Sequence, residues 1–375
     1  MQAAYLDPRT GATFPLSEPR WCGPAQAPLL LTPLPGIGPA EIDREVRSLW
    51  RYRAALPILV NEPITLGEGC TPLLRGTLRN IPMLLKCEWM MPTGSFKDRG
   101  ASVMLSLLRA QGVTEVLEDS SGNGGAAVSA YAAAGGMRAT IMAPAATSPA
   151  KLVQMHAHGA SVELVPGSRQ DTADAALRRA ASVFYASHNW HPFFLQGTKM
   201  LAYELWEDLG FRAPDNIIVP CGAGSNVLGC EIGFAELLRA GQVAAMPRLF
   251  AVQPTNCGPI AAAFLGDEQT ADEIRPTIAE GTAIAAPIRL REVLGALTET
   301  QGGAVMLTEQ EIAAATLELA RMGVYVEPTA AQPAGAFGKL LQAGTITPEQ
   351  TTVLVLTGSG LKATPRIAEL VGAAP

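Results

Sequence analysis

The sequence predicts an α/β protein whose sheets are parallel and doubly wound. From Met83 onward, short strand-like runs of aliphatic residues alternate with longer helix-like stretches. The chain has 375 residues, of which 48% are hydrophobic and 17% are charged, so it can bury a sizeable core in one large domain or two linked domains. No internal repeat or low-complexity segment interrupts this pattern, and disorder is not expected.

A proline-rich extension over residues 1–66 precedes the alternating region, and we expect one helix in it, at residues 42–52. The expected strands cover residues 83–87, 114–118, 138–143, 161–165, 183–186, 216–219, 248–253 and 352–356. The expected helices include residues 126–134, 149–157, 171–181 and 198–209. The stretch 267–303 has the least regular pattern, and we expect it to border the functional site or a dimer interface.

Charge and cysteine content argue against several classes of function. The net charge is −6 without a basic run, so nucleic acid is not an expected partner. No stretch reaches the roughly 18 uninterrupted apolar residues of a membrane span. The first residues lack a signal-peptide pattern, so we expect a cytoplasmic protein without a membrane partner. The six cysteines contain no C-x-x-C pair, so no metal is expected.

Lys97 is the most informative residue of the chain. It follows a Gly-Ser-Phe turn within the segment Pro92–Gly100, and small and apolar residues flank that segment. Desolvation in such a setting disfavours the charged ammonium form. A neutral lysine amine attacks aldehydes, which is how enzymes hold pyridoxal phosphate. Taken alone, the segment also fits a salt-bridged lysine at the start of a surface helix.

A second informative segment, Ser-Ser-Gly-Asn-Gly-Gly at residues 120–125, lies between an expected strand and an alanine-rich helix. A turn of small residues at a helix start exposes backbone N–H groups, which bind anions such as a carboxylate. The amide of Asn123 is suited to a hydrogen bond with a cofactor hydroxyl. The alternative interpretation is an ordinary capped helix.

Two further segments follow strands in the second half of the chain. Residues 220–226, Pro-Cys-Gly-Ala-Gly-Ser-Asn, open a helix that extends to residue 238, and their small side chains let the backbone approach a phosphate. Their spacing matches neither the dinucleotide fingerprint nor the P-loop. Thr357 ends the strand 352–356, so its hydroxyl is expected in the crevice where open α/β sheets bind ligands, and it suits a pyridine nitrogen.

Together these segments resemble the fold-type II pyridoxal-phosphate enzymes, whose fold is tryptophan synthase β-like, and among them the threonine synthase family. The resemblance covers most of the chain. The matching motifs are Gly-Glu-Gly-Cys-Thr-Pro-Leu at 67–73, the lysine segment at 92–100, Ser-Ser-Gly-Asn at 120–123, Gly-Thr-Lys at 197–199 and Thr-Gly-Ser-Gly-Leu-Lys at 357–362. Motifs in this order are specific for the superfamily and less specific for the reaction.

The resemblance implies a role for each motif. Lys97 would form the Schiff base with pyridoxal 5′-phosphate and then move the α-proton of the substrate. Asn123 would bond the cofactor O3′, and Thr357 would face its ring nitrogen. The residues expected to hold the cofactor phosphate are Gly222, Ala223, Gly224, Ser225 and Asn226. The residues expected to hold the substrate carboxylate are Ser120, Ser121 and Gly122.

Three positions near the expected substrate site depart from the threonine synthase pattern. Gly124 stands where the family usually has Thr after its Ser-Ser-Gly-Asn loop. His188 and Phe194 stand at the first Asn and the Arg of a segment resembling N-S-x-N-P-[YF]-R. An arginine offers up to five donors in a fork suited to phosphate and a phenylalanine offers none. Losing such a partner of a bound dianion costs roughly two to five kcal/mol, so we expect the substrate-phosphate clamp to be absent or rebuilt.

Aromatic residues replace polar ones along this wall of the expected site. Trp190, His191, Phe193 and Phe194 would make it less charged, which suits a substrate with a smaller or apolar leaving group. His188 or His191 is a candidate proton donor. The alternative is that these side chains simply pack under the sheet.

The resemblance also implies the domain organisation. A large cofactor-binding domain would combine residues 67–99 and 189–375, and a small mobile domain, residues 100–188, would carry the Ser-Ser-Gly-Asn loop. Residues 1–66 would be an extension in which Cys22 marks a degenerate metal knuckle. A homodimer is implied as well.

The expected function is that of a pyridoxal-phosphate-dependent carbon–oxygen lyase or synthase acting on a small amino acid. The family reaction converts O-phosphohomoserine to threonine. One alternative is a serine- or threonine-type β-eliminase, such as a dehydratase or ammonia-lyase, or a β-replacement enzyme, which fits Gly124 and Phe194 better. A further alternative is a homologue of low activity that only binds the cofactor.

Overall fold

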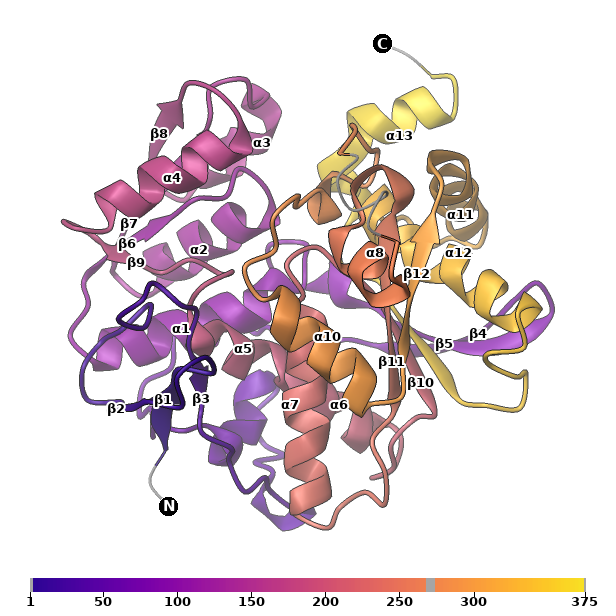
Figure 1. Cartoon of the computed structure of the whole chain (residues 1–375), viewed down its shortest axis with the longest axis horizontal. Helices are drawn as coiled ribbons and strands as arrows, with labels where there is room; N and C mark the ends of the chain where they lie inside the picture. The colour runs from indigo at the N-terminus through magenta and orange to yellow at the C-terminus, as the bar shows by residue number, and fades with distance from the viewer. Residues whose placement is uncertain (1–2, 268–273, 374–375) are drawn as a thin grey trace. The chain divides into compact units, whose positions relative to one another are not determined.

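The computed structural model describes residues 3–267 and 274–373, and its internal contacts divide the chain into two compact units. Unit 1 comprises Met1–Gly69 and Lys97–Met200, and unit 2 comprises Cys70–Phe96 and Leu201–Pro375. Each unit has its own parallel sheet (Figure 1). The extension 1–66 belongs to unit 1, and the domain ranges expected from the sequence stay a prediction.

Unit 1 is built on a four-stranded parallel sheet with the order β8-β7-β6-β9. The strands are β6 (Glu115–Glu118), β7 (Arg138–Pro144), β8 (Ser161–Val165) and β9 (Phe184–Tyr185). The helices are α1 (Lys97–Ala110), α2 (Asn123–Ala134), α3 (Pro149–Ala157), α4 (Arg169–Arg179) and α5 (Pro192–Thr198). The strand order reverses direction after β8, so right-handed crossovers place α4 on the face opposite α2 and α3, which is the doubly wound arrangement.

The N-terminal part of unit 1 is held by a buried carboxylate. This N-terminal part contains a small antiparallel sheet of β1 (Ala4–Leu6), β2 (Thr13–Pro15) and β3 (Leu30–Leu31). Glu68 has no exposed surface and accepts hydrogen bonds from Trp50 Nε1 at 3.1 Å, Ser102 Oγ at 2.5 Å and the Tyr131 hydroxyl at 2.9 Å. Because Ser102 lies on α1 and Tyr131 on α2, Glu68 ties the end of the extension to both helices.

Unit 2 is built on a six-stranded sheet with the order β12-β11-β10-β13-β5-β4, antiparallel only in the β4–β5 hairpin. The strands are β4 (Leu73–Leu78), β5 (Ile81–Lys86), β10 (Asn216–Pro220), β11 (Arg248–Pro254), β12 (Gly303–Leu307) and β13 (Thr352–Val355). The helices are α6 (Met200–Asp208), α7 (Ser225–Arg239), α8 (Pro259–Leu265), α10 (Leu290–Glu299), α11 (Glu309–Arg321), α12 (Pro328–Gln342) and α13 (Thr364–Leu370). Its main hydrophobic core joins the sheet to α11 and α12.

All eight strands expected from the sequence are confirmed, but the helix expected at residues 42–52 is wrong. A 3₁₀ segment, Leu49–Ala55, forms there instead, with Ser48 as its cap. The Leu49 N–H donates to the Glu68 carbonyl at 2.7 Å, and the Trp50 indole binds the Glu68 carboxylate. The first of these bonds takes a backbone donor that a helix over 42–52 would use, and the second anchors the Trp50 side chain, so tertiary contacts override local helix propensity.

Other boundaries shift for local reasons. The helix expected at 171–181 begins at Arg169, because Ser168 and Asp171 form a capping box. The helix expected at 198–209 is two helices, α5 and α6. The stretch 267–303, expected to be irregular, contains α10, while its residues 268–273 lie outside the described part of the chain.

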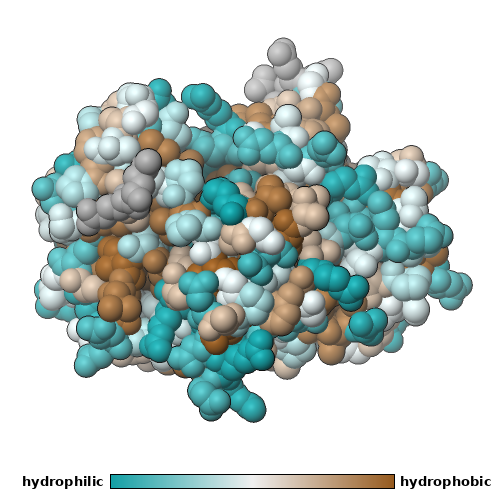
Figure 2. Space-filling view, turned by 90° about the horizontal axis from the view of Figure 1, so that it is seen from below, coloured by the Kyte–Doolittle hydropathy of each residue, from teal (hydrophilic) through white to brown (hydrophobic). Residues whose placement is uncertain are grey.

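The surface mixes polar and apolar residues. Figure 2 shows one face on which hydrophilic and hydrophobic residues are interspersed in small groups. The most exposed large hydrophobic side chains of the described residues, Leu59 and Leu361, are each 78% exposed. Within the same residues, no helix has the length and hydropathy needed to cross a membrane. The homodimer stays a prediction.

Candidate active site

Lys97 is the first residue of α1 and is half-buried. Its Nζ lies 5.5 Å from the centroid of the Phe194 ring. Helices α1 and α5 approach each other closely because Gly100 and Gly197 lack side chains: a Cβ on Gly100 would lie 2.4 Å from the Phe194 ring, and one on Gly197 would lie 2.1 Å from the Arg99 carbonyl oxygen. The position of Lys97 is therefore fixed by close helix packing.

The Ser-Ser-Gly-Asn loop connects β6 to α2 in the same unit. Ser120 is buried at the end of this strand, whereas Ser121 and Asn123 are half-buried and Gly122 is exposed. A Cβ on Gly125 would lie 2.0 Å from the Ser120 carbonyl oxygen, so the loop can close onto α2 only with glycine there. The loop thus presents the N-terminus of α2, where backbone N–H groups favour an anion.

Behind this loop, Glu118 and His188 form a buried pair that the sequence analysis did not identify. His188 Nδ1 lies 3.1 Å from Glu118 Oε1 and 3.0 Å from Oε2, and the His188 backbone N–H donates to Oε2 at 3.0 Å. Burial raises the pKa of Glu118, although hydrogen bonds from the His188 and Asp119 N–H groups oppose this. Burial, and next the positive charge of Lys97, lower the pKa of His188 well below its usual value.

Two departures from the threonine synthase pattern are in contact with each other. A Cβ on Gly124 would lie 2.7 Å from His188 Nδ1, 2.8 Å from its Cε1 and 3.0 Å from Ser120 Oγ. The imidazole therefore occupies the space that a side chain at position 124 would need. His188 Nδ1 is also the atom that contacts Glu118, so a side chain at position 124 would displace the ring from that carboxylate. The residues at positions 124 and 188 therefore depend on each other.

The expected aromatic wall divides into two groups. Trp190 packs against Trp21 of the extension, with ring centroids 5.5 Å apart. Phe193 packs against Tyr5 of the extension at 5.4 Å and against His191 at 4.9 Å. Their contacts fit the packing alternative. Phe194 instead faces Lys97, and its ring centroid lies 5.7 Å from that of His188. Phe194 has no exposed surface, and its contact with a substrate stays a prediction.

In unit 2, the glycine-rich segment forms the turn between β10 and α7. Gly224 has a φ of 90°, a conformation that favours glycine, and a Cβ there would lie 2.2 Å from a methyl carbon of Val293. A Cβ on Gly222 would lie 3.1 Å from the Gly281 carbonyl oxygen. The stretch 267–303 therefore borders this turn, through Gly281 and Val293.

The side chains of this turn fit a bound phosphate cofactor. Asn226 is 3% exposed, yet its Nδ2 and Oδ1 have no partner within the described residues. Buried polar atoms are rarely left unpaired without a reason. Thr357 follows β13, which pairs with β10, so its hydroxyl lies at the same edge of the sheet. That hydroxyl makes no hydrogen bond to any described residue, whereas the Thr357 carbonyl accepts from the Phe96 N–H at 3.0 Å.

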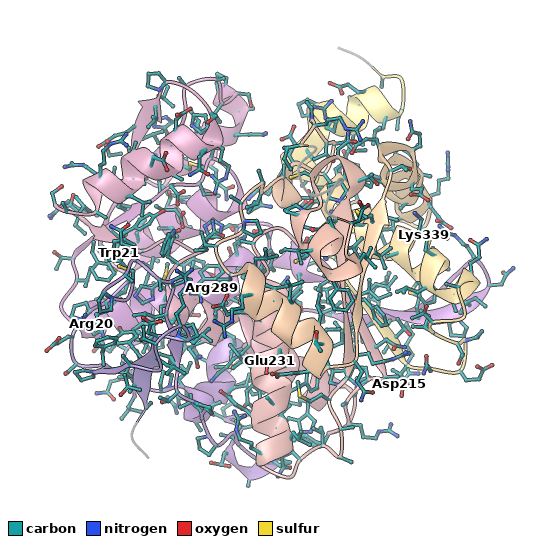
Figure 3. All side chains as sticks on the ribbon, viewed as in Figure 1. Arg20, Trp21, Asp215, Glu231, Arg289 and Lys339 are labelled. Atoms are coloured by element: carbon teal, nitrogen blue, oxygen red, sulfur yellow. The ribbon has the colours of Figure 1, made fainter. Side chains whose placement is uncertain are left out.

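Arg289 is a second buried charge that the sequence analysis missed. It precedes α10 (Figure 3). Its side chain is 2% exposed. Burial lowers its pKa to about 10, and the charge of Glu292 opposes this. It lies in the stretch judged least regular, where no periodic pattern marks a residue as buried.

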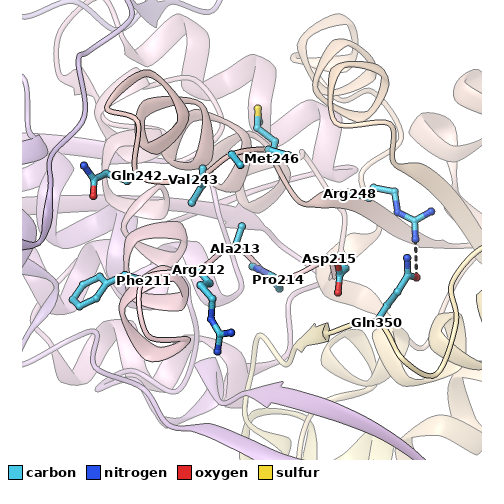
Figure 4. A pocket seen from close by; sticks show the side chains of 12 residues that line it. Phe211, Arg212, Ala213, Pro214, Asp215, Gln242, Val243, Met246, Arg248 and Gln350 are labelled. Carbon is cyan, nitrogen blue, oxygen red and sulfur yellow. Dashed lines mark hydrogen bonds between the residues drawn. The ribbon is translucent and has the colours of Figure 1, made fainter.

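Unit 2 also has a pocket of about 460 Å³, which is not lined by the glycine turn or by Thr357 (Figure 4). It surrounds the amino ends of β10 and β11, near Asp215 and Arg248, whereas the glycine turn and Thr357 lie at the carboxyl ends. Arg248 is already bonded to Asn216 at 2.9 Å, to the Thr345 carbonyl at 2.9 Å and to Gln350 at 3.0 Å. The Arg248 guanidinium is therefore already bonded within the protein and is not prepared to bind a ligand in this pocket.

The structure brings the expected residues together in two sets. Unit 1 gathers Lys97, Phe194, His188, Gly124 and the serine loop. Unit 2 gathers the glycine turn and Thr357. Among the described residues, no cluster of three or more His, Cys, Asp or Glu side chains suits a metal ion.

Comparison with known proteins identifies the class. A family model described as "Pyridoxal-phosphate dependent enzyme" matches residues 64–358, so the chain belongs to the pyridoxal-phosphate-dependent enzymes. It is similar to the threonine synthase of Methanosarcina acetivorans, with 33% identity over 86% of this chain and 82% of the relative. It is also similar to that of Methanocaldococcus jannaschii, with 34% identity over 85% and 81%.

Solved structures agree on the fold. A fungal L-serine ammonia-lyase from Rhizomucor miehei has a TM-score of 0.69 at 20% identity, covering 84% of this chain and all of that one. Threonine deaminase isoform 2 from Solanum lycopersicum has a TM-score of 0.67 at 20% identity, over 80% and 83%. The predicted fold class, the resemblance to threonine synthases and the cofactor are confirmed, and the chain is a pyridoxal-phosphate-dependent lyase.

Proposed function

We propose that this lyase removes an uncharged group, such as a hydroxyl, from Cβ of a small amino acid and releases a keto acid and ammonia. Serine would give pyruvate and ammonia, and threonine would give 2-oxobutanoate and ammonia. In each case the water lost in elimination is regained when the resulting imine is hydrolysed, so the atoms balance.

Phe194 is the observation that carries this proposal. It stands where the resemblance places an arginine for the substrate phosphate, and it is fully buried beside Lys97. An aromatic ring offers no hydrogen-bond donor to a phosphate, whereas arginine offers several. The His188 ring fills the space beside Gly124. Position 124 therefore offers no side chain that could bind a substrate phosphate in place of the arginine. A substrate without a phosphate matches this surface better.

The residues have distinct parts in such a reaction. The bound cofactor supplies an electron sink for the charge that develops at Cα. Lys97 would hold the cofactor and take the proton from Cα. The N–H groups of Ser121 and Gly122 would bind the substrate carboxylate at the N-terminus of α2. In unit 2, Asn226 and the glycine turn would hold the cofactor phosphate, and the hydroxyl of Thr357 would face the ring nitrogen without adding a charge.

Threonine synthesis from O-phosphohomoserine is the second candidate, because the similarity to threonine synthases covers more than four-fifths of the chain. In that case the phosphate would be bound by groups other than an arginine at position 194.

One experiment separates the candidates. The holoenzyme is incubated with O-phosphohomoserine while threonine and inorganic phosphate are followed, and in parallel with serine and threonine while keto acid is followed. Keto acid without threonine synthesis supports the elimination. Threonine and phosphate appearing together at enzymatic rates would overturn it. No turnover of any of these amino acids would favour a low-activity homologue, although Lys97, Asn123 and Thr357 are all present.

A further inference from the structure

Glu118 is an acceptor at both carboxylate oxygens. It has no exposed surface, and it receives the Asp119 N–H at 2.9 Å on Oε1 and the His188 N–H at 3.0 Å on Oε2. Backbone N–H groups can only donate. The third contact is His188 Nδ1, which is almost equally far from the two oxygens, at 3.1 and 3.0 Å. One N–H shared between two oxygens gives such near-equal distances, whereas an O–H donor would favour a single oxygen.

These contacts favour one tautomer of His188. Its ring is neutral near pH 7 because burial and Lys97 lower its pKa, with Arg169 acting in the same direction and Asp119 opposing. Asp119 is itself bonded to the Tyr185 hydroxyl at 2.8 Å. A neutral imidazole has one N–H, and the Glu118 carboxylate places it on Nδ1. The other nitrogen, Nε2, then carries a lone pair.

Nε2 lies on the side of the ring away from Glu118. The hydrogen bonds found for this ring among the described residues involve Nδ1, and His188 as a whole is 5% exposed. The same ring touches Phe194 edge-on and fills the space beside Gly124 in the first turn of α2. The lone pair is therefore part of the lysine-bearing half of the candidate site.

We propose that Glu118 holds His188 as a hydrogen-bond acceptor for a hydroxyl on the substrate side chain, and that the pair thereby rejects phosphate esters. The inference rests on the proposed function and names the group that the site recognises. A phosphate dianion has only acceptor oxygens and would face a lone pair backed by a buried carboxylate. A hydroxyl donates to Nε2 without charge repulsion. His188 would contact substrate, and Glu118 would act through it as a positioning residue.

The first test reads the tautomer directly. The chain has four histidines, so imidazole nitrogen NMR of histidine-labelled holoenzyme gives few signals, and the His188→Asn variant assigns the one of interest. We expect a proton on Nδ1 and a bare Nε2, unchanged between pH 5.5 and 8. A proton on Nε2, or titration near the ordinary histidine pKa, would overturn the proposal. This readout does not depend on turnover, so it stands even if the proposed function fails.

The second test measures selectivity. Glu118→Gln offers an amide donor to Nδ1 and would move the ring proton to Nε2. We expect kcat/KM for the hydroxyl substrate to fall about 10- to 100-fold, as for loss of one buried hydrogen bond. Binding of O-phosphoserine, followed by the change in cofactor absorbance, should strengthen or stay constant. The exposed His156 on α3, changed to Asn, is the matched control and should alter neither value.

A purely structural role predicts a different result. Equal losses for hydroxyl and phosphate ligands in Glu118→Gln would overturn the proposal. Thermal unfolding of each variant is measured in parallel. If Glu118→Gln does not fold, His188→Asn keeps the ring position polar and serves instead. Its hydroxyl-to-phosphate preference should fall by a similar factor, and an unchanged preference would contradict the inference.

Discussion

Units 1 and 2 prepare their functional groups in opposite ways. In unit 1, the buried carboxylates of Glu118 and Asp119 are already bonded, the first to His188 and the second to the Tyr185 hydroxyl. In unit 2, the amide of Asn226 is buried and has no hydrogen-bond partner among the described residues. Bonded side chains hold their geometry before a ligand arrives, whereas unbonded ones are completed by a ligand. We infer that unit 1 is shaped for a particular substrate and unit 2 for the cofactor.

The departures from the threonine synthase pattern follow the same division. Gly124, His188 and Phe194 all belong to unit 1. The glycine turn and Thr357 of unit 2 keep residue types that suit the cofactor. Changes in unit 1 should therefore alter which amino acid reacts, and changes in unit 2 should alter whether the cofactor is held.

The largest expected effect is at Lys97. Lys97→Ala removes the amine that holds the cofactor and moves the α-proton, so turnover should fall by at least about 1000-fold. The visible absorbance of lysine-bound cofactor should disappear as well. Spectra and steady-state rates check both, with the exposed Lys151→Ala on α3 as the control. A normal spectrum in the Lys97 variant would contradict the assignment.

Two buried asparagines of unit 2 should respond differently. Asn226→Ala removes an amide that has no hydrogen-bond partner in the described part of the chain, so cofactor affinity should fall about 10- to 100-fold with little loss of stability. Asn216 is bonded to Thr352 at 3.0 Å and to Arg248 at 2.9 Å. Asn216→Ala should therefore cost about 1–3 kcal/mol of stability and leave affinity unchanged. Cofactor titration and denaturant unfolding measure both variants. If the two variants lost affinity and stability to the same extent, the proposed difference between Asn226 and Asn216 would be contradicted.

The contact between Gly124 and His188 can be measured as a coupling energy. Gly124→Thr should push the imidazole away from Glu118 and destabilise the protein. Combining it with His188→Asn should recover part of the loss, with an interaction energy of about 1–3 kcal/mol. Unfolding free energies of the two single variants and the double variant give this value. Simple additivity would show that the two positions are independent.

The smallest effect is a pH dependence of unit 2. Burial, and next the charge of Glu299, raise the pKa of Glu231 on α7 from 4.5 to about 7. The folded state therefore binds this proton more tightly than the unfolded state, so the contribution is full below pH 4.5 and is lost as pH rises through about 7. Glu231→Gln should be more stable than the parent at pH 8 by on the order of 1 kcal/mol, given its partial exposure. Equal stability gains at pH 4.5 and pH 8 would contradict this assignment.

The sequence predicted elements well where a local pattern determines them. The strand at residues 248–253 follows from a run of mostly apolar residues that the structure buries. The strand at 161–165 follows from Val162 and Leu164 alternating with Ser161 and Glu163, and none of its residues is fully buried. The helix at 149–157 follows from a proline start and a glycine end. The helix expected at 42–52 did not form, and the Leu49 N–H of this stretch donates instead to the Glu68 carbonyl, outside the local sequence pattern.

The residues of the candidate site also divide into those that the sequence revealed and those that it did not. Lys97 and the glycine turn were visible because their residue types are unusual where they stand. The role of Glu118 was not visible, since a carboxylate at the end of a strand looks like an ordinary surface residue. Gly124 and His188 were each identified, but their mutual contact depends on the fold that places α2 beside residue 188. For the fold, the capping box of Ser168 and Asp171 was a sequence signal that could have predicted the start of α4 at Arg169.

The strand order of unit 2 has a consequence for synthesis of the chain. Strand β5 pairs with β13, which lies near the other end of the sequence. While the ribosome is still translating, β5 and its hairpin partner β4 have no inner neighbour, and the edge of β10 that later binds β13 is also open. Unit 1 is completely translated by Met200. The nascent protein thus carries one unit able to fold early and one sheet that closes last, and this unpaired hairpin is where a chaperone would be needed.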